Sequence, residues 1–253
     1  MNSRWQNLIK SALPFGLVLS AWWAVAAAGW YPPSLLVSPQ AVAQSLTDGL
    51  SSGELQAHLS VSLGRLIVGL ALGSGIGLLF GILMAVSRTF DVATAPLFNT
   101  VRQVPSIALI PVLILILGVD ETFKVVIIMK AAFFPVALAA AEAVRGIPAA
   151  HIEVARAYRL PRRTVLWKIL LPATVPDVVT GFRLAAGRSW GTLVAAELIA
   201  SDAGLGQMME FGRQMFRMDV VMLGLVIAGL IGFAMDRALK ALEVRLTGWK
   251  GAR

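Results

Sequence analysis

Residues 66–86 form an apolar run that contains no charged side chain. A helix needs about 20 apolar residues to cross the hydrocarbon core of a bilayer, so this run predicts a membrane-spanning helix. Further apolar runs of similar length predict spans at residues 13–30, 92–117, 123–144, 178–200 and 220–239. The sequence therefore predicts an all-α integral membrane protein with about six transmembrane helices.

The composition supports this fold class and excludes others. Hydrophobic residues make up 57% of the chain and charged residues only 14%, against about 25% in soluble domains. We expect a single transmembrane domain over residues 1–253, because no segment has the composition of a soluble domain. The chain has no Cys, which excludes disulfides and thiolate chemistry, and its two His, His58 and His151, are too far apart in sequence for a His-rich metal site.

The basic residues predict the orientation of the spans. With both termini in the cytoplasm, fourteen Lys and Arg lie on the cytoplasmic side and three on the outer side, while five fall within or beside spans. An excess of this kind marks the cytoplasmic side of bacterial membrane proteins. The net charge of +8 is then explained by topology and by the anionic inner leaflet, and we expect no nucleic-acid partner.

A short helix is expected between the first two spans, on the outer side. Ser38 and Pro39 are typical of a helix start, with Ser as the N-cap and Pro at the first helical position. Val42, Leu46 and Leu50 then recur every four residues. This pattern predicts an amphipathic helix that lies on the membrane surface.

The second span carries a stripe of glycines on one face, formed by Gly69, Gly73, Gly77 and Gly81. Glycines four residues apart let another backbone approach closely, which is how helices associate in lipid. The stripe predicts a helix-packing face. The partner is either a helix of the same subunit or one of a second copy.

A polar hairpin at about residues 145–172 separates the fourth and fifth spans. Six basic residues lie in it, and by the predicted topology it faces the cytoplasm. The helix after Pro148 must end near Leu160, because Pro161 disfavours the α conformation in the residue before it. A second helix starts at Pro161 and ends at Pro172. Such an element is suited to insert into a cleft of another protein.

The hairpin resembles the EAA loop of permease subunits in bacterial ATP-binding cassette (ABC) importers. That loop reads Glu-Ala-Ala, three residues, Gly, nine residues, then Ile-x-Leu-Pro. Val154 replaces the middle Ala of the pattern, and Arg159 occupies the Gly position. The residues that the resemblance implies for coupling to an ATPase are Glu153, Val154, Ala155, Arg156, Ala157, Arg159, Ile169, Leu171 and Pro172.

Other stretches are similar to the nitrate, sulfonate and taurine branch of that family, so the resemblance covers nearly the whole chain from about Pro32. They are "VPSIALIPVLILILGVDETFKVVIIMKAAFFP" (residues 104–135), "GRSWGTLVAAELIASDAGLGQMM" (187–209) and the tail "RLTGWKG". The resemblance implies a type I ABC importer permease fold in the bacterial cytoplasmic (inner) membrane.

The resemblance also implies a mechanism and partners. Two permease copies, identical or homologous, form a pathway that works by alternating access. Two cytoplasmic ABC ATPase subunits bind the EAA loops. A periplasmic or extracellular binding protein delivers the cargo. The chain has no Walker-type phosphate loop, so we expect ATP and Mg to be bound by the ATPase partner. We therefore expect this chain to be a transport subunit that is not an enzyme and binds no cofactor. The implied cargo is taurine or another sulfonate, or nitrate.

Charged residues within spans are costly and need a reason. For the translocation pathway we single out Lys130, Arg188, Trp190 and Glu197. Lys130 either lines the pathway or pairs with Glu142 or Asp120. Arg188 either attracts an anionic cargo or forms an internal ion pair.

Three further arginines in the spans are expected to be structural. Arg65 lies near the outer end of its span and can extend its charged end to the interface. Arg102 and Arg183 are expected to pair with acids or with lipid headgroups.

Two other classes of protein remain as alternatives. An ion-coupled secondary transporter or channel would need broken helices or acids at the midplane, and the prolines of the third and fourth spans allow this. An intramembrane enzyme would need a nucleophile with a base or paired acids, and the chain offers little to build them from.

Overall fold

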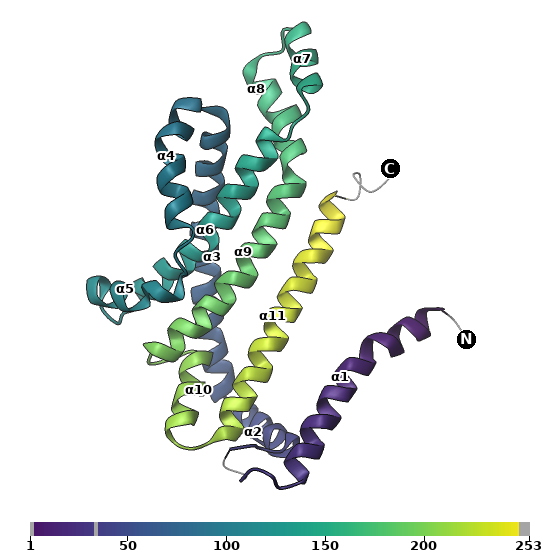
Figure 1. Ribbon diagram of the computed structural model, residues 1–253, viewed down its shortest axis with the longest axis vertical. Coiled ribbons are helices and arrows are strands. Elements are labelled where there is room, and N and C mark those ends of the chain that lie inside the picture. The colour runs from purple at the N-terminus through teal and green to yellow at the C-terminus, as the bar shows by residue number, and fades with distance from the viewer. Residues whose placement is uncertain (1–2, 33–34, 248–253) are drawn as a thin grey trace.

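The computed structural model of the protein describes residues 3–32 and 35–247, which form helices and no strand. In chain order the helices are α1 (Ser3–Ala27), α2 (Pro39–Ser52), α3 (Glu54–Val86), α4 (Arg88–Val101), η1 (Ile107–Leu109), α5 (Ile110–Leu117), α6 (Glu121–Arg145), α7 (Ala149–Ala157), α8 (Arg162–Val165), η2 (Leu166–Leu170), α9 (Leu171–Ile199), α10 (Leu205–Gln214) and α11 (Met218–Thr247). Figure 1 shows α7 and α8 at one end of the molecule and α2 and α10 at the other. The expected all-α fold is confirmed.

The long helices account for the membrane spans. Among the described residues, α3, α6 and α11 are long and apolar enough to cross a membrane, and a fourth span results if Arg163–Ile169 and α9 count as one bent span. The expected fifth span corresponds to α9, which is less apolar because it contains Arg183, Arg188 and Glu197. The expected first span corresponds to α1, whose apolar part is the shorter segment Gly16–Ala27.

The expectation of one continuous third span over residues 92–117 is wrong. The chain forms α4, then the single turn η1, then α5. Pro105 has no N–H and disfavours the helical conformation in Val104 before it, so the helix cannot continue there. Pro111 is tolerated because it lies in the first turn of α5. The break leaves residues 102–106 outside any helix, and this loop lines a cavity described below.

The glycine stripe packs α3 against α6 of the same subunit. Its members Gly69, Gly73, Gly77 and Gly81 all face α6. A Cβ added to Gly77 would lie 2.6 Å from the carbonyl oxygen of Phe133, and one added to Gly81 would overlap the backbone of Ala137. The two backbones are thus too close for any side chain between them, which is the arrangement that small residues permit in lipid.

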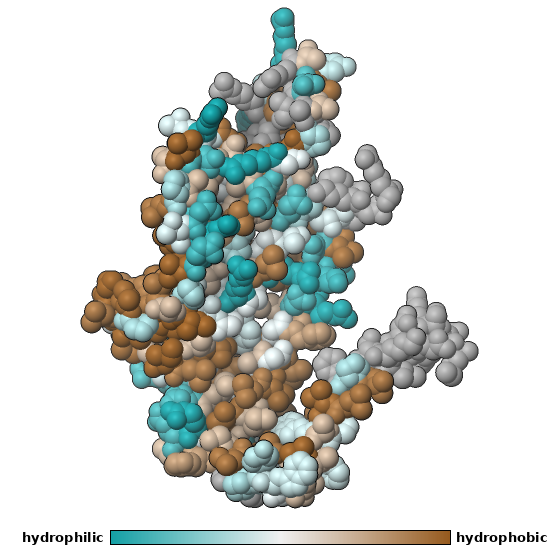
Figure 2. Space-filling view, viewed as in Figure 1, coloured by the Kyte–Doolittle hydropathy of each residue, from teal (hydrophilic) through white to brown (hydrophobic). Residues whose placement is uncertain are grey.

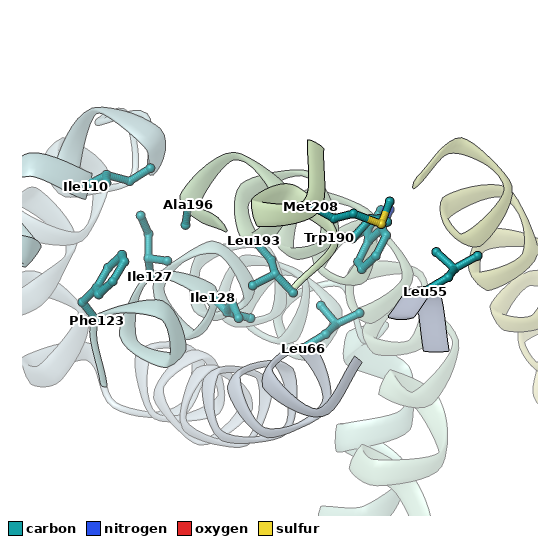
Figure 3. Packing of buried hydrophobic residues seen from close by; sticks show 11 residues of the cluster. Leu55, Leu66, Ile110, Phe123, Ile127, Ile128, Trp190, Leu193, Ala196 and Met208 are labelled. Atoms are coloured by element: carbon teal, nitrogen blue, oxygen red, sulfur yellow. The ribbon is translucent and has the colours of Figure 1, made fainter. Parts of the chain in front are cut away.

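α6 lies between α3 and α9 and supplies the centre of the hydrophobic core. Figure 3 shows Phe123, Ile127 and Ile128 of α6 beside Leu193 of α9 and Leu66 of α3. All three α6 side chains are fully buried. This packing fixes the relative positions of the helices that carry the charged residues of the spans.

A cluster of phenylalanines holds α4 on the same framework, and its members are Phe80, Phe90, Phe98, Phe133 and Phe134. The rings of Phe98 in α4 and Phe134 in α6 have centroids 5.1 Å apart, and those of Phe80 and Phe98 are 5.7 Å apart. Contacts of this kind stabilise aromatic pairs beyond their area burial. The cluster therefore places the end of α4, where Arg102 lies, against α6.

A buried carboxylate, Glu197, joins α9 to α3 and to the first turn of α10. Only 1% of Glu197 is exposed. Its oxygens accept hydrogen bonds from Ser62 Oγ at 2.8 and 2.9 Å, from Arg65 Nη1 at 2.8 Å and from the backbone N–H of Gly206 at 3.0 Å. Ser62 Oγ in turn accepts from the backbone N–H of Leu205 at 2.8 Å. The carboxylate is thus fully hydrogen-bonded, as a buried charge requires.

Arg65 extends this network to α6. Its guanidinium binds both oxygens of Glu121 and donates to the carbonyl oxygen of Ala203 at 2.6 Å. Glu121 also accepts from Lys124 Nζ at 3.1 Å. Arg65 has the structural role that we expected, but the expectation that it reaches out to the interface is wrong, because only 6% of it is exposed. The network formed by Ser62, Arg65, Glu121 and Glu197 is called the outer charge network below.

The helix expected between the first two spans is α2. Ser38 is its N-cap, and Ser38 Oγ accepts a hydrogen bond from the backbone N–H of Ala41 at 3.3 Å. Val42 is buried, while Ser45 Oγ donates to a carboxylate oxygen of Asp219 in α11 at 2.6 Å. α2 is therefore packed by Val42 and Ser45 onto the end of the bundle opposite α7, whereas Leu50 of the expected apolar face is 47% exposed.

The α3–α6 packing predicts different effects of two glycine substitutions on the same helix. Gly77→Ala should lower the melting temperature in detergent, because its Cβ overlaps Phe133 and overpacking costs about 1–3 kcal/mol. Gly75→Ala is the matched control, since a Cβ at Gly75 meets nothing within 4 Å and Ala favours helix by about 1 kcal/mol over Gly. Equal melting temperatures for the two variants would contradict this packing.

Candidate functional site

The polar hairpin projects beyond the helical bundle at the end of the molecule opposite α2 and α10, as Figure 1 shows. Glu153, Val154 and Ala157 of α7 are exposed, whereas Ala155 is buried. The side chain of Arg156 lies outside the described side chains. The exposed face thus combines a carboxylate with small apolar groups at the tip of the molecule.

The turn after α7 has the conformation that the Gly of the EAA pattern would allow. Arg159 has φ 48°, in the left-handed region. The backbone N–H of Leu160 donates to the carbonyl of Ala155 at 2.9 Å, and that of Tyr158 donates to Val154 at 3.0 Å. The first of these bonds is typical of a helix that ends on a left-handed residue. The turn is therefore retained with Arg159, although a non-Gly residue has a steric free-energy cost in the left-handed region.

The return segment leads directly into α9. α8 is followed by η2, one turn of π-helix, and η2 continues into α9 without a loop. Ile169 and Leu171 are half-buried, and Pro172 is exposed. Any displacement of the hairpin is therefore applied to the start of α9.

Two exposed aromatic residues of the hairpin were missed by the sequence reasoning. Tyr158 is 77% exposed at the end of α7, and Trp167 of η2 is also exposed. Their exposure could have been predicted, because each lies in a polar segment of the sequence rather than in an apolar run. Exposed aromatic side chains next to a charged tip are frequent anchors of protein–protein contacts.

Of the four residues singled out for the pathway, the structure brings Lys130 and Arg188 together in one cavity. The cavity has a volume of about 460 Å³ and lies between α6, α9 and the loop after α4. Arg102, which we did not assign to the pathway, is its third cation. We call it the basic cavity; the other lining residues used below are Val104, Phe134 and Gly191.

Trp190 and Glu197 lie elsewhere. Trp190 is buried in the core, where its Nε1 donates to the carbonyl of Ala228 at 2.9 Å. Glu197 is enclosed in the outer charge network. Neither lines the basic cavity; both pack α9 against other helices, and a role of either in a pathway stays a prediction.

Lys130 has no partner among the acids that we considered. Its Nζ donates to the carbonyl of Val104 and lies 5.7 Å from the centre of the Phe134 ring. Within the described residues it forms no ion pair with Glu142 or Asp120, so that alternative is wrong. The remaining alternative, a position on the wall of a cavity, agrees with the geometry.

A second cavity of about 390 Å³ shares Arg188 and Pro135 with the basic cavity. Glu142 and Asp177 line it, and both lie nearer to the hairpin along their helices than Lys130 and Arg188 do. The second cavity thus has two acids and Arg188 on its wall.

Arg183 forms the ion pairs with acids that we expected. Its guanidinium binds Asp236 at 2.6 Å and Glu243 at 3.2 Å, which joins α9 to α11. In the part of the chain that the structure describes, no three acidic or His side chains are grouped so that they could hold a metal ion. The three cations of the basic cavity offer electrostatic attraction to a negatively charged group.

Comparisons with known proteins agree with this geometry. The family described as "Binding-protein-dependent transport system inner membrane component" matches residues 77–248. The taurine transport system permease protein TauC of Escherichia coli (strain K12) is 34% identical over 98% of this chain and 93% of its own length. A permease of Bacillus subtilis (strain 168) named for aliphatic sulfonates transport, SsuC, is 32% identical over 96% of this chain and 88% of its own length.

Two solved structures share the fold. A chain of the MetNI methionine ABC transporter in an inward-facing conformation is similar with a TM-score of 0.57 at 24% identity, covering 71% of this chain and 92% of that one. A chain of an amino acid ABC transporter has a TM-score of 0.65 at 11% identity, covering 79% of this chain and 97% of that one. This protein therefore belongs to the family of inner-membrane permease subunits of binding-protein-dependent ABC transporters, which cross the membrane several times and are not themselves enzymes.

Proposed function

We propose that this permease imports a small sulfonate such as taurine, with nitrate as the next candidate, and that α7 is the helix by which an ATPase drives it. The observation that carries the proposal is the hairpin at one end of the molecule, in which the exposed Glu153 and the buried Ala155 match the EAA pattern. The hairpin is continuous with α9 through η2, so force applied to α7 reaches the bundle. ATP and Mg are bound by the ATPase partner in this proposal.

The cargo class is supported by two independent features. The relatives named above are named for taurine and for aliphatic sulfonates. The basic cavity supplies three cations to an anion. An ion-coupled secondary transporter or channel, which the prolines left open, is disfavoured because the chain belongs to an ATP-driven family.

The pathway requires a second copy of the permease, and a homodimer is the arrangement we propose. Leu115 of α5 is 87% exposed and its neighbour Ile116 is 71% exposed. On the face seen in Figure 2, hydrophobic side chains cover α5, and hydrophilic ones are concentrated in the half toward α7. α5 also adjoins the loop that lines the basic cavity. Closed twofold symmetry would then bring the two cavities to a common axis, with lipid around the pair.

The orientation follows from the hairpin. If α7 meets a cytoplasmic ATPase, both termini lie in the cytoplasm, and α2 and α10 lie at the outer end, where a binding protein delivers the cargo. The basic residues of the hairpin support this orientation because they are concentrated on the same side.

Glu153→Arg tests the coupling role of α7. We expect the variant to insert and dimerise normally but to lose co-purification with the ATPase and substrate-stimulated ATP hydrolysis, because a charge reversal is placed on the docking face. Asp48→Arg, the same reversal on an exposed residue of α2 at the opposite end, is the control and should keep co-purification with the ATPase. Wild-type values for Glu153→Arg would remove α7 from the coupling mechanism.

Substitutions of Arg159 test whether the left-handed turn presents α7 correctly. Arg159→Gly should keep or improve ATPase binding and thermal stability, since Gly relieves a cost of about 1 kcal/mol at positive φ. Arg159→Val should weaken both, because β-branched residues tolerate this region worst. Binding affinity for the ATPase and the melting temperature are the measurements. Equal behaviour of the Gly and Val variants would show that the turn does not need this conformation.

A further inference from the structure

The three cations of the basic cavity differ from Arg65, Lys124 and Arg183, which are paired with acids. Arg102 comes from the end of α4, Lys130 from the middle of α6 and Arg188 from α9, and all three line one cavity. None of them forms an ion pair with a carboxylate within the described part of the chain. Three elements distant in sequence thus bring positive charge to one place without the acid that would neutralise it.

Other cations of the bundle show what the usual arrangement is. Arg65 binds Glu121 and Glu197, and Lys124 also binds Glu121. Arg183 binds two acids, Asp236 and Glu243, although it lies only five positions before Arg188 on the same helix. A charge at membrane depth is costly unless paired, and for these residues the fold supplies the pair. For the three cations of the basic cavity, the described part of the chain supplies no such pair.

The hydrogen-bond donors of the cavity are equally short of acceptors. Arg102 Nε is buried and has no hydrogen-bond partner. Lys130 Nζ, which can donate three bonds, makes one to the carbonyl of Val104. A buried donor without an acceptor costs about 1–3 kcal/mol, so these groups favour a ligand that accepts several hydrogen bonds. A sulfonate has three acceptor oxygens and a negative charge.

The depth of the cavity distinguishes between two sources of such an oxyanion. A transported sulfonate and the phosphate of a lipid headgroup have similar acceptor chemistry. Lys130 lies nine residues from the start of α6, which places it roughly 14 Å along the helix axis. The hydrocarbon core is about 30 Å thick, so this position is near its middle and far from either headgroup layer. The depth favours an anion that arrives through water.

We propose that Arg102, Lys130 and Arg188 form a binding site within the membrane for the sulfonate group of the cargo. The site rests on the proposed import of a sulfonate and deepens it by naming the side chains that hold the anion in transit. The second cavity, with Glu142 and Asp177, lies between this site and the hairpin end.

The absence of native Cys permits a direct test with a single reporter thiol. Gly191 lines the basic cavity, and a Cβ added there meets nothing within 4 Å, so Gly191→Cys places a thiol in the cavity without steric cost. The full chain, in phosphatidylcholine nanodiscs, is treated with two methanethiosulfonate reagents, one bearing a sulfonate and one a trimethylammonium group. Each forms a mixed disulfide with the thiol and releases methanesulfinate. Gly187→Cys, where a Cβ also meets open space, is the second reporter.

The measured quantity is the ratio of the two modification rates, divided by the same ratio for free 2-mercaptoethanol. A change in the pKa of the thiol affects both reagents equally and cancels in the ratio. A cavity lined by one sign of charge raises the rate of the opposite ion by roughly 10–10³-fold, so we expect the sulfonate reagent to be favoured at least tenfold. A ratio equal to that of the free thiol would overturn the proposal.

Substitutions then assign the effect to the three cations. Arg102→Gln, Lys130→Gln and Arg188→Gln should each lower the ratio several-fold, whereas Lys130→Arg should retain it. Arg213→Gln on α10 removes a cation that is paired with Glu210, and it should leave the ratio unchanged. Size-exclusion profiles and melting curves confirm that the variants are folded. Gln variants that keep the wild-type ratio would overturn the site.

Competition identifies the source of the anion. Ethanesulfonate in solution should slow modification by the sulfonate reagent, and this protection should be lost in the Gln variants. Protection by phosphatidylglycerol in the nanodiscs but not by ethanesulfonate would assign the site to lipid and overturn the proposal. The assay needs no ATPase, so its failure is distinguishable from failure of the coupling role of α7.

Discussion

A charged side chain at membrane depth must find a counter-charge, and this constraint organises the polar part of the protein. It explains why Glu197 and Ser62 are enclosed where α3, α9 and the loop before α10 meet. Gly204 in that loop has φ 119°, and a Cβ there would overlap the Glu197 carboxylate, so only Gly fits beside the buried charge. The same requirement joins α9 to α11 through Arg183. In the basic cavity the fold supplies no counter-charge, and we infer that a ligand supplies it.

α9 connects these features along a single helix. It starts directly after the docking hairpin, passes the basic cavity at Arg188 and reaches the outer charge network at Glu197. Seventeen residues separate Leu171 from Arg188, which corresponds to roughly 25 Å along the axis. A rigid helix of this kind can carry a displacement from the hairpin to the cavity, while the charge network holds its far end.

Features that depend on local sequence were predicted well. The glycine stripe of α3, the N-cap at Ser38 and the helix between Pro148 and Pro161 each rest on spacing or on a single residue type, and each has a counterpart in the structure. The helix end expected at Pro172 is wrong, because Pro172 lies in the first turn of α9, where a proline is tolerated. The turn after α7 forms even though Arg159 stands at the Gly position of the EAA pattern, because backbone hydrogen bonds specify the turn.

Features that depend on distant partners could not be predicted. Arg65 finds its acids 56 and 132 positions away, and no local pattern indicates them. The broken third span shows a different difficulty, since its apolar composition favours a span while Pro105 prevents a continuous helix. Arg102 then reaches the basic cavity because of that break, so one missed element explains why its role was missed as well.

The central claim is that nucleotide-driven motion of the ATPases moves the α7 helices and, through α9, the basic cavities. Spin labels on Ala157→Cys, which is exposed on α7 in a chain without native Cys, would report the distance between the two α7 helices of the assembled transporter. We predict that double electron–electron resonance gives a shorter distance between the two spin labels with bound ATP than without nucleotide. An unchanged distance in a complex that hydrolyses ATP would contradict the account.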